Sequence, residues 1–275
     1  MTADRSRQPA GPDPVYYTRL RLFPRSVVIG LAGAVLLSIA LHSGRAPCRA
    51  QERVATPQRP SISFGTGTVP DDMWELEAGG LLARGGSAIP LFLKYGLTDR
   101  TEFEVGIDAV RQIEQPDGIR SSMGDLFLGV RSRRSLRQGR SAAIVGWLLV
   151  PTAVEGVGST HYDAGAVGVL SLPLGGLTLD TNLWLVGIGR DEGTIVGRVQ
   201  AVANLGIPLR GCWSSFAELS LQRTAGTGSG GFIDAGVACA ASRTSVFDLA
   251  VGAGWDRGFP EWTVNVGWTR LFDRE

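Results

Sequence analysis

The stretch TEFEVGIDAV at residues 101–110 decides the fold class. Its apolar and polar side chains alternate, so that Phe103 and Val105 share one face while Glu102 and Glu104 share the other. Alternation with a period of two is typical of a β-strand whose two faces meet different surroundings. This segment therefore predicts a strand with one apolar and one polar side.

Similar segments recur along the chain and predict an all-β protein. Their length of about nine to eleven residues is what a tilted strand needs to cross a bilayer, and an even number returns both ends to one side. We therefore expect a closed antiparallel up-and-down transmembrane β-barrel of about twelve strands over residues 72–275. Pro90 cannot donate a ladder hydrogen bond, so we expect a bulge there. The predicted strands are 73–82, 88–95, 101–110, 125–133, 142–151, 161–170, 179–185, 199–205, 213–222, 231–240, 247–255 and 261–272.

Residues 1–50 have the features of a signal peptide. Arginines precede an apolar run over Val27–Leu41, whose length suits the core of a signal peptide and falls short of the roughly 20 residues of a spanning helix. We expect cleavage after Ala50, and an uncleaved signal anchor is the alternative. Residues 51–71 are rich in Pro, Ser, Thr and Gly, and we expect them to form a flexible periplasmic lead-in.

The composition excludes several functional classes. The 275 residues carry a formal net charge of +1, but residues 51–275 alone carry 20 basic and 24 acidic side chains, a net of −4. No basic patch suggests a nucleic-acid partner. Beyond the expected cleavage site the chain has one histidine, His161, and two distant cysteines, Cys212 and Cys239, which form no metal-ligand spacing. We expect no cofactor and no bound metal.

Aromatic side chains on the apolar face fall at the ends of the predicted strands. Two such belts are typical of a bilayer's two interfaces, whereas a soluble sandwich or barrel, the alternative, would scatter its tryptophans through a core. With the export signal, the belts favour the outer membrane of a bacterium. Those at the expected periplasmic ends are Trp74, Tyr95, Phe103, Trp213, Phe247, Trp268 and Phe272, and those at the outer ends are Tyr162, Trp255 and Trp262.

The polar face supplies the candidate pore-lining residues. A barrel of twelve strands is wider than one of eight, whose side chains fill it, and narrower than large porins. Either the charges pair across the lumen and close it, or acidic residues line a narrow, cation-favouring pore. Trp184 either fills space or stacks an aromatic solute. The candidates are Glu75, Glu77, Lys94, Glu102, Glu104, Asp108, Asp125, Arg131, Arg133, Asp180, Trp184, Arg198, Glu218, Asp234 and Asp248.

Cys212 and Cys239 fall on neighbouring strands but on opposite faces. Directly opposed residues of an antiparallel pair share a face. Cys212 has the parity of Glu218, whereas Cys239 has the parity of Ile233. A disulfide between them therefore requires a bulge, and the alternation favours two free thiols.

Several short motifs resemble the MetA-pathway phenol-degradation family of outer-membrane transporter barrels. The resemblance covers roughly residues 70–272. It implies an outer-membrane location and a role in the transport of aromatic or other apolar small molecules, and it brings no catalytic motif. The motifs are KYGLTDRTEFEVGIDAV (94–110), MGDLFLGVRSR (123–133), LLVPTAVEGVGSTHYDAGAVGVLS (148–171), SSFAELSLQ (214–222) and FDLAVGAGWDRGFPEWTVNVGWTRLF (247–272).

These observations favour an outer-membrane channel for the passive passage of small molecules. A structural or adhesive barrel without flux is the alternative. A hydrolase is less well supported, because a serine nucleophile needs a base and His161 matches no hydrolase motif, so we do not expect an enzyme. The expected partners are outer-membrane lipid, the barrel-assembly machinery and a small solute that the sequence does not identify.

Overall fold

The computed structural model describes residues 55–256 and 258–272, which are almost entirely β-strand. Within these residues, no helix is both long and apolar enough to span a membrane. The predicted signal peptide, its apolar core and its cleavage site lie outside the described residues. The strands are β1 Trp74–Ala83, β2 Gly86–Thr98, β3 Thr101–Gln115, β4 Gly118–Ser122, β5 Leu126–Ser135, β6 Ser141–Val150, β7 Asp163–Leu174, β8 Leu177–Gly189, β9 Ile195–Pro208, β10 Trp213–Thr224, β11 Gly228–Ser242, β12 Ser245–Asp256 and β13 Trp262–Phe272.

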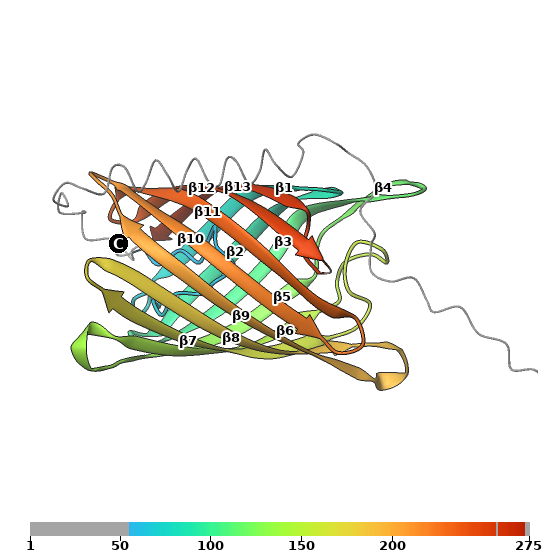
Figure 1. Cartoon of the computed structure of the whole chain (residues 1–275), viewed down its shortest axis with the longest axis horizontal. Coiled ribbons are helices and arrows are strands. Elements are labelled where there is room, and N and C mark those ends of the chain that lie inside the picture. The colour runs from blue at the N-terminus through green and yellow to red at the C-terminus, as the bar shows by residue number, and fades with distance from the viewer. Residues whose placement is uncertain (1–54, 257, 273–275) are drawn as a thin grey trace, which may run out of the picture.

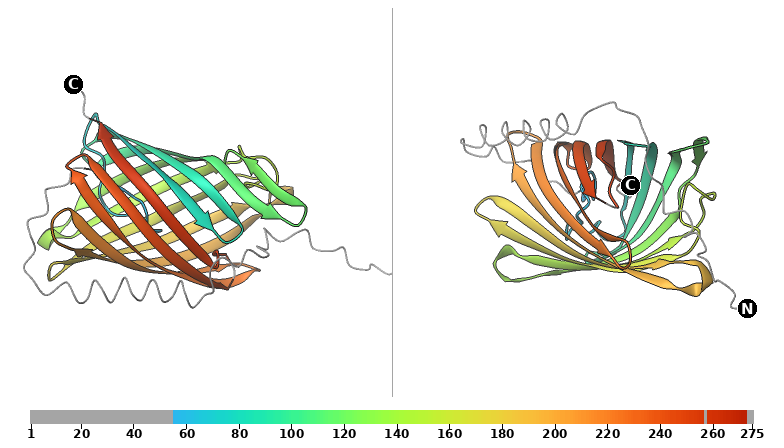
Figure 2. Two further views of the ribbon diagram at one scale, coloured as in Figure 1. Left: turned by 90° about the horizontal axis from the view of Figure 1, so that it is seen from above. Right: turned by 45° about the vertical axis from the view of Figure 1, so that its right-hand side comes forward.

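Twelve of these strands form a closed antiparallel barrel (Figures 1 and 2). Neighbours in sequence pair with one another, and β1 closes the ring by pairing with β13, from Trp74 opposite Phe272 to Ala83 opposite Thr263. The predicted closed up-and-down barrel is therefore confirmed. We call the end at which β1 begins and β13 ends the terminal end, and the opposite end the distal end.

Two local features of the predicted strand pattern have clear outcomes. The expected bulge is confirmed, because the β2–β3 register shifts between Ile89 and Pro90. The predicted strands 101–110 and 125–133 leave residues 111–122 as an expected loop, and this prediction is wrong. β3 continues to Gln115 and forms a hairpin with β4, and the left-handed backbone of Gly118 (φ 136°) belongs to its tight turn. This hairpin projects beyond the barrel wall at the distal end (Figure 1).

The polar face of each strand points inward. On β3, Glu102 and Glu104 are fully buried, whereas Phe103 between them is 38% exposed on the outer wall. A soluble barrel would have the opposite arrangement, with its apolar face inside. The outer wall also carries exposed aromatic side chains at both ends, including Trp74 at the terminal end and Tyr162 at the distal end. The barrel thus has the apolar exterior of a membrane-spanning one.

Residues 55–70 lie inside the barrel. For these residues, the prediction of a flexible periplasmic lead-in is wrong. Figure 2 shows this stretch, which we call the lumen segment, as a blue trace within the ring of strands. Its side chains are largely buried, including Ala55 at 1% and Val69 at 0% exposure. The segment is ordered because its backbone N–H groups find carboxylate acceptors on the barrel's inner wall.

A disulfide joins Cys212 and Cys239, contrary to the expectation of free thiols. The parity argument was correct for the strands, since Cys239 lies opposite Trp213. Cys212, however, lies in the turn before β10, where strand alternation no longer sets its direction. The two Cα atoms are 4.8 Å apart, within the usual range for a disulfide.

Candidate functional site

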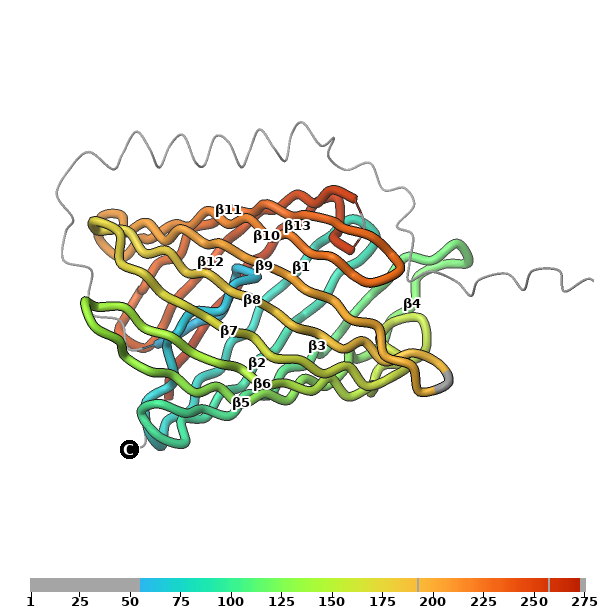
Figure 3. The backbone as a smooth tube through the Cα atoms, turned by 60° about the horizontal axis from the view of Figure 1, so that its bottom comes forward, coloured from blue at the N-terminus to red at the C-terminus, as the bar shows by residue number. Residues whose placement is uncertain are grey.

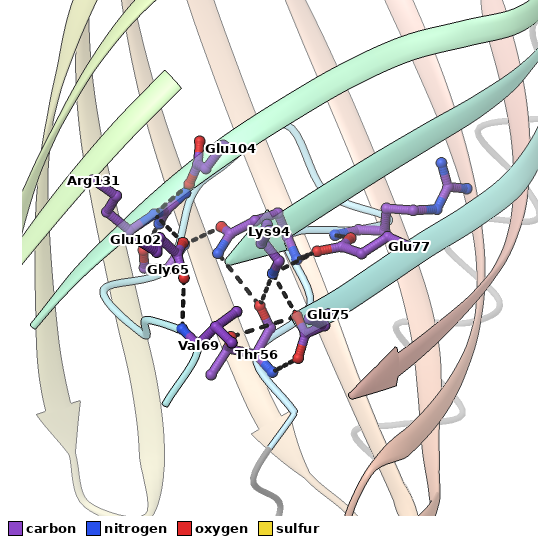
Figure 4. A network of polar contacts seen from close by, with 11 residues as sticks. Thr56, Gly65, Val69, Glu75, Glu77, Lys94, Glu102, Glu104 and Arg131 are labelled. Atoms are coloured by element: carbon purple, nitrogen blue, oxygen red, sulfur yellow. Dashed lines mark hydrogen bonds and ion pairs between the residues drawn. The ribbon is translucent and has the colours of Figure 1, made fainter. Parts of the chain in front are cut away.

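The interior of the terminal half contains a buried ion cluster around Lys94. Its ammonium group contacts Glu75 and lies 2.7 Å from a carboxylate oxygen of Glu77, and all three side chains are fully buried. The Lys94 Nζ also donates to the backbone oxygen of Thr56 at 2.6 Å, while the Thr56 N–H donates to Glu75 at 2.7 Å (Figure 4). The cluster therefore holds the start of the lumen segment.

A second buried cluster lies around Arg131. Its Nε is 3.0 Å from Glu102 and 2.8 Å from Glu104. The same guanidinium donates to the backbone oxygen of Gly65, and Glu102 accepts the N–H of Val69 (Figure 4). This cluster holds the end of the lumen segment.

Glu218 holds the middle of the lumen segment from the other side of the barrel. It accepts the N–H groups of Ile62 at 2.8 Å and Ser63 at 2.9 Å. Asn182 on β8 accepts the N–H of Phe64 at 2.6 Å and donates to its oxygen at 3.0 Å. The segment is thus anchored on β1, β3, β8 and β10.

A pair of inward glycines provides room for Arg59 of the lumen segment. Gly79 and Gly267 lie opposite each other on β1 and β13. A Cβ on Gly79 would lie 2.4 Å from the Arg59 guanidinium, and one on Gly267 would lie 2.6 Å from its Nε. Arg59 uses this space to donate to the backbone oxygen of Val266 at 2.9 Å.

These contacts explain how so many charges can be buried. An unpaired buried charge is costly, and a carboxylate that accepts several N–H bonds is compensated. Four buried glutamates of the two clusters face only two cations, Lys94 and Arg131, and backbone N–H groups provide further donors. The acidic side chains of the two clusters are therefore bonded to cations and to the lumen segment.

Aromatic rings cover the inner wall of β2, β5 and β6 beside the lumen segment. Phe92 and Phe127 have ring centroids 5.5 Å apart, and Phe127 stacks on Trp147 at 6.0 Å. Further round the wall, Trp184 lies 4.8 Å from Phe64 of the lumen segment. These inward rings are only partly buried, so part of each side chain remains exposed inside the barrel. We call Phe92, Phe127 and Trp147 the aromatic arc.

The distal end of the lumen is narrowed by loops. Phe259, in the loop after β12, stacks on the inward Phe232 with centroids 5.4 Å apart. Asp125 lies just before β5 and accepts the N–H groups of Thr152 and Ser159 at 3.1 and 2.6 Å. Asp125 therefore fixes a distal loop.

The structure brings together some of the sequence-predicted residues and separates others. The two clusters unite Glu75, Glu77 and Lys94, and Glu102, Glu104 and Arg131, while Glu218 serves the lumen segment.

The remaining inward candidates occupy separate places along the wall. Asp108 pairs with Arg111 at 3.4 Å, and an oxygen of Asp248 lies 4.0 Å from Arg59. Asp234 lies opposite Glu218. Asp180, on β8, and Arg198, on β9, belong to neighbouring strands. Arg133, near the terminal rim, forms no ion pair with any described residue.

Sequence reasoning missed the lumen segment and the aromatic arc. Phe92 has the parity of Lys94 and Phe127 that of Arg131, and large rings on a polar face were a signal that could have identified them. The strand β6 has no alternation of polar and apolar residues that would place Trp147. No sequence pattern in residues 55–70 predicts their position inside the barrel. Their main contacts are made by backbone N–H groups, which do not depend on the side-chain sequence.

Comparisons with known proteins support the fold. No protein-family model matches the sequence, and no curated protein matches it. Among solved structures, the chain is similar to the COG4313 outer membrane channel from Pseudomonas putida F1, at a TM-score of 0.62 and 12% identity, over 78% of this chain and 100% of that one. It is also similar to the NanC porin, at a TM-score of 0.54 and 7% identity, over 72% and 98%. At these identities the likeness establishes an outer-membrane-type barrel fold.

Proposed function

We propose that this chain is a bacterial outer-membrane channel for the passive passage of small aromatic or apolar molecules. The aromatic arc of Phe92, Phe127 and Trp147 on the lumen wall carries the proposal. Stacked rings bind flat apolar solutes and stabilise each ring pair by about 0.5–1.5 kcal/mol beyond area burial. The fold similarity to two outer-membrane pores and the motif resemblance to transporter barrels support the same class.

The proposal includes an orientation and a route. Export by a cleaved signal peptide and insertion by the barrel-assembly machinery place the terminal end in the periplasm, as in single-chain bacterial barrels. A solute enters past Phe232 and Phe259, contacts the aromatic arc and passes beside the lumen segment. No catalytic step is involved, because the lumen groups bind and sort the solute without reacting with it.

Planar-bilayer conductance of the purified, folded protein tests the proposal. Phenyl glucoside and methyl glucoside share the same sugar, but only phenyl glucoside has an aromatic ring. The difference between the concentrations at which they block the current therefore reports binding of the ring. We expect phenyl glucoside to block the current at lower concentration. Trp147→Ala should weaken that block about two- to tenfold, because one aromatic contact is lost. The block by methyl glucoside should be unchanged.

Trp213→Ala is the matched control, since Trp213 is 50% exposed on the outer wall. It should leave the block unchanged. Equal block by the two glucosides, or equal effects of the two tryptophan variants, would contradict aromatic selection in the lumen.

A barrel without flux is the second candidate, and the buried lumen segment favours it. The clusters around Lys94 and Arg131, together with Glu218, hold this segment across the barrel interior. Folded protein that inserts into bilayers but adds no conductance, even at high voltage, would support this structural role over the channel.

A further inference from the structure

The aromatic belt on the outer wall is interrupted at the terminal end. Its members lie on β1–β3, β10, β12 and β13, whereas the outward positions of β5–β9 carry no aromatic side chain within the described residues. Figure 3 brings the face formed by these strands toward the viewer. The belt members at the terminal end are Trp74, Tyr95, Phe103, Trp213, Phe247, Trp268 and Phe272.

Exposed arginines occupy the terminal end where the belt is missing. Arg134 ends the outward row of β5, and Arg137 and Arg140 lie in and after the turn that leads to β6. Arg100, in the neighbouring turn, is joined to the end of β5 by a backbone hydrogen bond from Arg133 to its oxygen, at 2.8 Å. The described residues contribute no carboxylate that forms an ion pair with these side chains.

An apolar hollow of about 620 Å³ opens on the same side of the barrel. Gly168, Ala201 and Ala203 form its shallow floor, because their small side chains lie between the exposed leucines 170, 183 and 221. The hollow and the arginines are continuous across the sheet, since Leu170 pairs with Ala142 and Ala142 pairs with Arg134.

We propose that this face binds an anionic glycerophospholipid of the inner leaflet, with its phosphate on the arginines and an acyl chain in the hollow. A guanidinium carries a positive charge and has a planar set of N–H donors that can donate two parallel hydrogen bonds to phosphate oxygens. The interrupted belt supports a phospholipid partner, because at this part of the rim exposed arginines lie where interfacial aromatic rings are missing. The hollow accommodates a chain beside the cations that hold its headgroup.

Native mass spectrometry of the detergent-purified protein, titrated with phosphatidylglycerol or phosphatidylcholine, tests this proposal. The combined variant Arg134→Gln, Arg137→Gln and Arg140→Gln should weaken phosphatidylglycerol binding by about tenfold or more. Its phosphatidylcholine binding should stay unchanged. The control replaces three arginines near the distal end by glutamine, namely Arg111, Arg190 and Arg223, and should retain phosphatidylglycerol.

A second variant tests the hollow without altering charge. A Cβ on Gly168 would meet no atom within 4 Å, so Gly168→Leu places an apolar side chain in the hollow without a clash at Cβ and should also weaken phosphatidylglycerol binding. This variant decides the question if the arginine variant does not fold, as judged by heat-modifiable gel mobility.

Three outcomes would overturn the proposal. The first is equal phosphatidylglycerol affinity in the two arginine variants. The second is that the Arg134, Arg137 and Arg140 variant loses affinity for lipid A and keeps its affinity for phosphatidylglycerol. The third is that a second copy of the chain covers the hollow, so that Gly168→Leu disrupts a protein dimer. The inference rests on the membrane location proposed above but not on flux. Its lipid binding and the channel's conductance are separate measurements that can fail independently.

Discussion

Glu218 on β10 accepts the backbone N–H of Ser63 at 2.9 Å, across 155 residues of sequence. The same carboxylate accepts the N–H of Ile62 and an amide hydrogen of Asn204. One acidic side chain, predicted to line a pore, thus holds a segment predicted to lie outside it.

Glu218→Ala should release the middle of the lumen segment. The variant removes the two charge-assisted hydrogen bonds to the segment, each worth about 1.5–3 kcal/mol, so the population of the displaced segment should rise by about a hundredfold or more. We expect a higher mean conductance in planar bilayers. Glu155→Ala, in an exposed distal loop, is the control and should conduct as the parent does. Unchanged conductance in both would show that the segment does not limit the pore.

Gly267→Ala should displace Arg59 from its space between the glycines. The new Cβ would lie 2.6 Å from Arg59 Nε and 2.5 Å from an oxygen of Asp248, which is closer than van der Waals contact allows. We expect the thiol of an added Ser61→Cys substitution to react faster with a water-soluble maleimide when Gly267→Ala is also present. Gly146→Ala is the control, because a Cβ there meets no atom within 4 Å. Equal labelling rates in the two variants would contradict this role.

Lys94→Met should destabilise the barrel. It leaves Glu75 and Glu77 buried without their shared cation, and breaking a buried ion pair costs about 3–5 kcal/mol. The temperature at which the folded band disappears on a heat-modifiable gel should fall. Adding Glu77→Gln to this variant should restore part of the loss. A transition temperature equal to that of the parent would refute the assigned role of the cluster.

Cys212 and Cys239 should be recovered as one linked peptide pair by mass mapping under non-reducing conditions. Replacing both by serine should lower the free energy of unfolding by about 2–4 kcal/mol, because the bond closes a loop between residues 27 positions apart. Denaturant titration of the folded protein measures this change. Two free thiols in the parent protein would disprove the bond.

The sequence by itself determined the closed barrel, its polar interior and the Pro90 bulge. These features follow from a period of two and from the missing N–H of proline, which are local properties of a chain. The same parity placed Glu75, Glu102 and Glu218 on the inner face. It failed at Cys212, which lies in a turn, and at 111–122, where a hairpin replaces the expected loop.

Only the tertiary structure decided what these inner side chains bind. The sequence of the lumen segment has no alternation of polar and apolar residues that would place it inside the barrel. Its backbone N–H groups find their carboxylate acceptors only when barrel closure brings β1, β3 and β10 around it. Sequence parity assigns a side chain to a face, whereas strand register and curvature bring it to a particular partner. For this reason the interior acids were predictable, and the segment that they hold was not.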